Sequence, residues 1–127
     1  MINELKNELK IESSVDIIPW TYSDLKWDRI SNLAPIALKC ADKGDKLSIQ
    51  ILNKNAEGLI QWAIAVHKKM NWNENFKIVL CGSLVTNESI YQRLIFERLK
   101  NTFPEAEITL PLVPPSVGAA LIVLRKI

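Results

Sequence analysis

Apolar residues recur along the chain with a helical period over most of its length and form short unbroken runs near the C-terminal end. The run from Ile78 to Cys81 precedes Gly82 and Ser83, and it is typical of a strand buried on both faces, as in a parallel sheet. A second, shorter strand is expected over Glu107 to Leu110. The helical segment between the runs predicts that the strands are parallel and joined by a right-handed crossover.

The longest helical pattern runs from a cap at Asp45 to about Met70, with Trp62 among its core residues and Gly58 at a close-packing position. Other helices are expected over Met1 to Ile11, from a cap at Ser31 to Gly44, over Glu88 to about Asn101 behind a cap at Asn87, and from Ser116 onward. The segment Val15 to Tyr22 is apolar but contains Pro19, which predicts an extended link or an edge strand.

Two strands alone form a marginal sheet, because its faces and edges need cover. The pattern therefore predicts a single and partial α/β domain over 1–127, with a helical or extended lead-in over 1–30 and a lobe segment over 31–127. The missing strands would come from another polypeptide, from a swapped copy or from a longer parent protein. The alternative is that Val15 to Ile18 pairs with the other strands and completes a small three-stranded sheet.

Composition and charge limit the classes of partner and site that the chain is expected to have. Of its 127 residues, 48% are hydrophobic and 24% are charged, which are ordinary values for a globular domain. A net charge of +2 with scattered lysines and arginines argues against nucleic acid, and the apolar stretches are too short for a membrane span. Cys40 and Cys81 are expected to be reduced core residues of a cytoplasmic protein, and a single histidine argues against a structural zinc site.

The turn after the first strand is the strongest candidate for a binding site. A glycine such as Gly82 lets a ligand approach the backbone closely, and open α/β sheets bind ligands at the carboxyl ends of their strands. The other candidate residues are weaker candidates for a functional role. His67 is expected to be a surface or boundary histidine, and Cys81 lacks a partner base that would make it a nucleophile. The carboxylate pairs Asp42 with Asp45 and Glu105 with Glu107 are expected to be solvated. Gly118 is expected to be a close-packing position.

Three segments in order resemble a known family. They are ISNLAPIALKCADKGDKLSIQIL from Ile30, IVLCGSLVTN from Ile78 and LPLVPPSVGAALIV from Leu110. They are similar to the "LAP…A..GD..A..I" helix pair, the adenosine-binding strand and turn, and the closing "P…P..GAA" segment of the N-acetylglucosamine kinases and the related BadF/BadG-type ATPases. The resemblance implies the fold class: an α/β, helix-rich C-terminal portion of a ribonuclease-H-like lobe of the actin-like ATPase superfamily, with a short parallel strand pair.

The resemblance also implies ATP as the ligand. Gly82, Ser83, Leu84 and Asn87 would face its adenosine part, and Glu57 or Gln61 would line the opposite wall. The family's phosphate-binding hairpins of the "DGGGTK" and "DGS" kind do not occur in this sequence. The catalytic aspartate, the sugar site and the Mg²⁺ ligands would therefore lie outside this chain, and the chain alone is expected to be inactive.

Two rival interpretations stay open. The chain could be a non-catalytic interaction module that joins a partner or a second copy of itself through its open sheet edge. It could also be an orphan fragment of such a kinase, without a role of its own.

Overall fold

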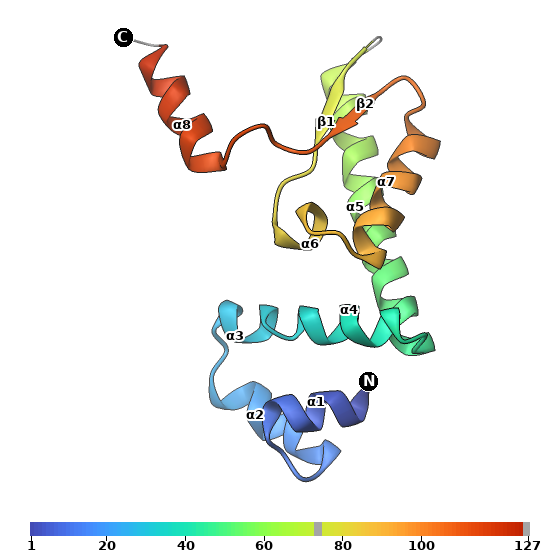
Figure 1. Cartoon of the computed structure of the whole chain (residues 1–127), viewed down its shortest axis with the longest axis vertical. Helices are drawn as coiled ribbons and strands as arrows, with labels where there is room; N and C mark the ends of the chain where they lie inside the picture. The colour runs from blue at the N-terminus through green and yellow to red at the C-terminus, as the bar shows by residue number, and fades with distance from the viewer. Residues whose placement is uncertain (73–74, 126–127) are drawn as a thin grey trace.

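The computed structural model describes residues 1–72 and 75–125, and helices dominate this part of the chain (Figure 1). Its elements in order are α1 (Ile2–Leu9), the 3-10 helix η1 (Ser14–Asp16), α2 (Ile17–Ser23), α3 (Trp27–Ser31), α4 (Ala34–Asp42), α5 (Lys46–Met70), β1 (Lys77–Val79), α6 (Ser83–Thr86), α7 (Ile90–Thr102), β2 (Glu107–Thr109) and α8 (Pro115–Leu124). None of the helices in these two ranges is long and apolar enough to cross a lipid bilayer.

The two predicted strands pair in parallel, which confirms the β-α-β order read from the sequence. Ile78 lies opposite Ile108 in the register, and the Leu80 N–H donates a hydrogen bond of 2.9 Å to the Thr109 carbonyl. Within the described residues the sheet consists of these two strands. The alternative of a third strand from Val15 to Ile18 is therefore not what this structure shows.

The expectation that the first strand is buried on both faces is wrong. Phe76 and Leu80 are buried and Ile78 packs against the core, whereas Lys77 and Val79 point away and Val79 is 50% exposed. Such alternation belongs to a sheet that is covered on one face only. Helices α5 and α7 pack beside that face, and no described element covers the other one.

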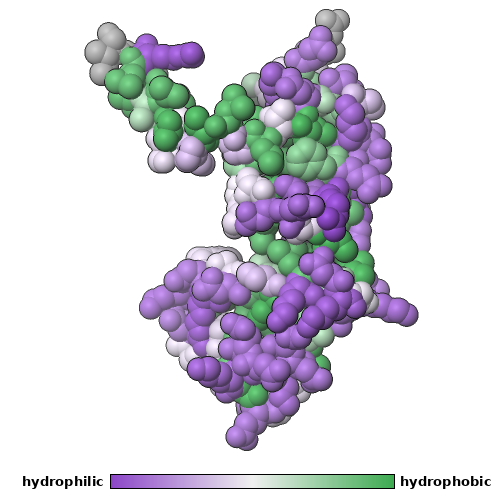
Figure 2. Space-filling view, viewed as in Figure 1, coloured by the Kyte–Doolittle hydropathy of each residue, from purple (hydrophilic) through white to green (hydrophobic). Residues whose placement is uncertain are grey.

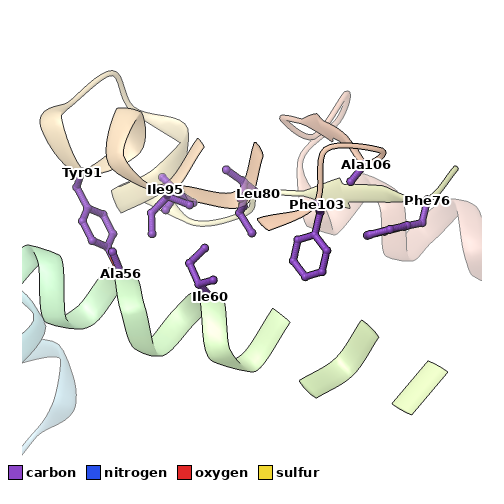
Figure 3. Close-up of a cluster of buried hydrophobic side chains, with 10 residues drawn as sticks. Ala56, Ile60, Phe76, Leu80, Tyr91, Ile95, Phe103 and Ala106 are labelled. Carbon is purple, nitrogen blue, oxygen red and sulfur yellow. The ribbon is translucent and has the colours of Figure 1, made fainter. Parts of the chain in front are cut away.

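The core lies between α5, α7 and the strand pair (Figure 3). Ala56 and Ile60 of α5 meet Ile95 and Leu99 of α7, and Phe103 follows at the end of α7. Ala56 and Ile95 are fully inaccessible to solvent, so they mark the centre of the cluster. The apolar spacing on both helices, which is the spacing of one helical face, explains why they pack together.

The boundary between α4 and α5 confirms the predicted stop and cap. Gly44 has a φ of +82°, and the N–H groups of Gly44 and Asp45 donate hydrogen bonds to carbonyls in the last turn of α4. The bond from the Asp45 N–H to the Cys40 carbonyl is 3.0 Å long. The Asp45 carboxylate then accepts from the backbone N–H of Ser48 at 2.8 Å and from the ammonium group of Met1 at 3.0 Å. These bonds lower the pKa of Asp45 to about 2, and the bond from the Ser48 N–H has the largest effect. The capping carboxylate is therefore charged at neutral pH.

The lead-in is helical, so the expectation of an extended link over Val15 to Tyr22 is wrong. Ser13 and Asp16 form a reciprocal capping box that starts η1, and α2 continues from it directly. Pro19 is the third residue of α2, where its missing N–H has no intrahelical partner to lose. Ser31 ends α3 rather than capping α4, which begins at Ala34.

Several apolar positions are more open than the pattern predicted. Trp62, expected in the core, is 77% exposed, and Cys81 is exposed whereas Cys40 is buried as expected. A Cβ atom at Gly58 or Gly118 would meet no heavy atom within 4 Å, so neither glycine is at a close-packing position.

Helix α8 stands away from the rest of the chain in Figure 1. None of its residues is buried, although its sequence PSVGAALIVL is almost wholly apolar. Figure 2 shows this apolar surface as green atoms over α8, in contrast to the purple surface of the N-terminal helices. An all-round apolar helix is a buried element in ordinary globular proteins, so its exposure here is unusual.

Candidate functional site

The turn between β1 and α6 has the conformation that only glycine adopts readily. Gly82 has φ +107° and ψ +145°, and a Cβ atom there would meet nothing within 4 Å. Its carbonyl accepts hydrogen bonds of 3.0 Å from the backbone N–H of Val85, from the N–H of Thr86 and from the Thr86 hydroxyl. The turn is therefore held from within, and the space beside its backbone is open.

Asn87 does not cap the helix that follows the turn, contrary to expectation. The turn enters the short helix α6 directly at Ser83, and Asn87 ends that helix in an extended conformation. The hydroxyl of Ser89 caps α7 instead, by accepting from the backbone N–H of Gln92 at 3.1 Å.

Two hollows flank this turn. The first, here called the turn hollow, has a volume of about 540 Å³ and lies between the 79–85 segment, Leu59 of α5 and Tyr91 of α7. The Tyr91 hydroxyl, whose pKa burial raises further above its ordinary value, is protonated at neutral pH like that of any tyrosine and can donate a hydrogen bond.

The second, here called the α4 hollow, has a volume of about 590 Å³ and lies between α4 and the α6–α7 segment. Ser83 and Leu84 line both hollows, so the start of α6 is the partition between them. The α4 hollow is lined on one side by Pro35, Leu38, Lys39, Asp42 and Lys43, and on the other by Ser83, Leu84, Asn87, Glu88 and Ser89.

The structure thus brings the four predicted site residues to one place but distributes them. Gly82 faces the turn hollow, Asn87 faces the α4 hollow, and Ser83 and Leu84 border both. An apolar Leu84 flanked by hydroxyl and amide groups can contact a planar ring and hydrogen-bond its edges. Whether nucleotide binds there stays a prediction.

The opposite wall lies only partly where the sequence predicts it. Glu57 and Gln61 line neither hollow, but their helix α5 contributes Leu59 to the turn hollow, and α4 forms one wall of the α4 hollow. Pro35, Leu38 and Asp42 recur at spacings of three and four residues and so share one face of α4, but this spacing does not show which segment that face opposes.

The other candidate residues stay outside the site. His67 contacts Phe76 and Phe103, with ring centroids 4.8 and 5.2 Å apart, and it is partly exposed, as a boundary histidine would be. Across residues 1–72 and 75–125, no three His, Cys, Asp or Glu side chains are grouped to hold a metal ion.

Comparison with known proteins identifies the class to which this chain belongs. The model of the BadF/BadG/BcrA/BcrD ATPase family matches residues 4–123. The chain is therefore a member of the BadF/BadG/BcrA/BcrD ATPase family, as the three ordered segments indicated.

Within the curated proteins, the chain is similar to the N-acetyl-D-glucosamine kinase of Dictyostelium discoideum. The two sequences are 31% identical over 126 residues, which are 96% of this chain and 40% of that kinase. The chain thus spans well under half the length of the curated relative it matches. No solved structure matches the chain.

Proposed function

We propose that this chain is the nucleotide side of an ATP-dependent sugar kinase similar to N-acetylglucosamine kinase, and that it adopts part of a ribonuclease-H-like lobe. The observation that carries the proposal is the Gly82 turn, whose open backbone lies at the end of a parallel strand between two hollows that share Ser83 and Leu84. The adenosine part of ATP binds there, with Leu84 against the purine and Asn87 at its edge.

The residues around the Gly82 turn fit the adenosine side of a kinase, and the chemistry of phosphoryl transfer needs further groups. Phosphoryl transfer requires a metal-bound triphosphate and a carboxylate that accepts the proton of the acceptor hydroxyl. Mg²⁺, when bound, neutralises charge on the phosphates, and the residues that hold it belong to another part of the assembly. In this chain Gly82 and Ser83 position the ribose, and Leu84 excludes water from the base. The proposed location is cytoplasmic, which suits the free thiols Cys40 and Cys81.

The proposal predicts saturable adenosine binding by the chain, without catalysis. In calorimetric titrations Leu84→Ala should weaken adenosine binding about tenfold, because losing a leucine contact costs roughly 1–2 kcal/mol. Leu112→Ala is the matched control, since Leu112 is fully exposed and lines neither hollow.

A chain incubated with ATP, Mg²⁺ and N-acetylglucosamine should form no phosphorylated sugar. Sugar-dependent ATP turnover would contradict the assignment of the catalytic residues to another part of the assembly. Equal adenosine affinities in the two leucine variants would contradict the assignment of the site.

A second candidate function, a self-assembling interaction module, is favoured by the exposed apolar surfaces. An apolar hollow of about 310 Å³ opens between α5 and β1, bordered by Trp62, Val66 and Phe76, and the same chain carries the uncovered helix α8. An apolar helix that enters an apolar groove is a common mode of association. The occupant proposed here is α8 of a second copy.

Light scattering over a range of concentrations tests this candidate. We expect a dimer, and Leu121→Asp on α8 should convert it to a monomer because a charge cannot enter the groove without desolvation. The control is Val15→Asp, at an exposed position of η1. A wild-type chain that is monomeric at every concentration would contradict self-assembly. Another part of a kinase would then have to cover these surfaces.

A further inference from the structure

The cations of the α4 hollow are held by a carboxylate from a different helix. Glu4 of α1 contacts Lys43, the residue that follows α4, with its Oε1 atom 2.6 Å from the Lys43 Nζ atom. Its other oxygen, Oε2, lies 3.6 Å from the Nζ atom of Lys39, one turn earlier on α4. A single carboxylate thus bridges both lysines that line the hollow.

The two lysines border the hollow while their ammonium groups contact a residue outside its lining, Glu4. Lys39 also borders a second depression, about 380 Å³ in volume, that is shared with Glu4 and Glu8. Lysine side chains are long and flexible, and the three side chains involved are between 33% and 64% exposed, so the ammonium groups can exchange one anionic partner for another.

The lining of the hollow is balanced in charge, with Lys39 and Lys43 opposite the carboxylates Asp42 and Glu88. Glu4 does not line the hollow, but it adds a third carboxylate next to both ammonium groups. While Glu4 is there, it makes the surroundings of the two lysines net negative, which disfavours an incoming anion. Without Glu4 both ammonium groups lose this shared partner.

We propose that Glu4 regulates the charge of the α4 hollow: Lys39 and Lys43 bind phosphate groups of the ligand, and Glu4 competes with those phosphates for the two ammonium groups. The proposal rests on the proposed nucleotide function for the identity of the ligand but not for the competition itself. The Lys43 hydrogen bond lowers the pKa of Glu4, and the same bond raises the pKa of Lys43, so both partners are charged at neutral pH and the competition persists there. Helix α1 therefore weakens anion binding at the α4 hollow.

The probe is inorganic triphosphate, which carries the charge of the nucleotide without its base. At an ionic strength of about 10 mM, where charges are weakly screened, Glu4→Gln should tighten triphosphate binding by about threefold, in the range measured for exposed ion pairs. Glu8→Gln is the matched control, because it removes the same charge from the same helix at a carboxylate for which the described residues show no ion pair. Its affinity should equal that of the wild type.

A variant without both lysines, Lys39→Gln with Lys43→Gln, makes the test specific. In this background Glu4→Gln should bring no gain, since the ammonium groups that it frees are absent. Equal gains in Glu4→Gln and Glu8→Gln, a loss in Glu4→Gln, or no triphosphate binding in any form would overturn the proposal.

Adenosine separates the two proposals. Its affinity should be the same in the wild type and in Glu4→Gln, because adenosine has no phosphate. A chain that binds triphosphate as described but does not bind adenosine would leave the competition standing and remove the nucleotide function.

Discussion

Ile95→Ala is expected to lower the free energy of unfolding by about 4 kcal/mol, the largest change expected from a single truncation in this chain. Ile95 is fully inaccessible to solvent and lies between α7 and α5, where Ala56 and Ile60 pack around it. Domains of this size are stable by roughly 5–15 kcal/mol, so the loss is a large share of the total. Urea unfolding followed by circular dichroism measures it.

Ile122→Ala is the matched control for this prediction. Ile122 belongs to α8 and is 61% exposed, so its truncation leaves no cavity and should change the free energy of unfolding by less than about 0.5 kcal/mol. Similar losses in the two variants would mean that α8 is packed in solution and that the core is not confined to the contact between α5 and α7.

Local chemistry explains why α5 could be predicted so well. Gly44 ends α4 through its positive φ and Asp45 begins α5 through its side chain, and both effects depend on neighbouring residues only. The 25 residues of α5 also give its apolar period room to repeat. Its bounds, Lys46–Met70, therefore follow from the sequence.

The choice of buried face on α5 could not be predicted in the same way. Leu59, Trp62 and Val66 are spaced as regularly as Ala56 and Ile60, so the helix carries two apolar faces. Only the packing of α7, some forty residues away in sequence, decides that Ala56 and Ile60 are inside. The spacing alone therefore predicts Trp62 in the core, whereas its side chain is exposed.

The site was predictable where it depends on one turn and not where it depends on distant helices. Gly82 after an apolar run indicated a strand that ends beside open backbone, and the structure has that turn. The opposing walls come from α5 and α4, both distant in sequence from the turn, and no local pattern reports which helix faces a turn. Asn87 ends the short helix α6, and Ser89, two residues later, caps α7.

Under the proposed function, the exposed apolar surfaces would have one common explanation. Val79 on the outer face of the sheet, Trp62 on α5 and the whole of α8 are left open by the described chain. The chain corresponds to 40% of the kinase to which it is similar. In that proposal, a lobe that continues the sheet would cover those surfaces and supply the Mg²⁺ ligands and the catalytic carboxylate.

Gly82→Ala is expected to weaken adenosine binding at least tenfold. Alanine at φ +107° and ψ +145° costs of the order of 1–3 kcal/mol, so the turn is expected to move to another backbone conformation. Adenosine binding must then restore the original conformation, and every 1.4 kcal/mol that this requires lowers the affinity tenfold. The cost is conformational and not steric, since a Cβ atom there meets nothing within 4 Å. Calorimetric titration with adenosine gives the affinity, and urea unfolding gives the stability.

Gly58→Ala is the control, because Gly58 lies within α5 with equally open space around its Cβ position but with ordinary helical geometry. It should raise the free energy of unfolding by up to about 1 kcal/mol and leave adenosine affinity unchanged. Opposite signs for two Gly→Ala changes would show that backbone conformation, not side-chain volume, decides the effect at Gly82. If Gly82→Ala lost stability but kept full affinity, the geometry of the turn would stand, and the ligand would have to bind away from it.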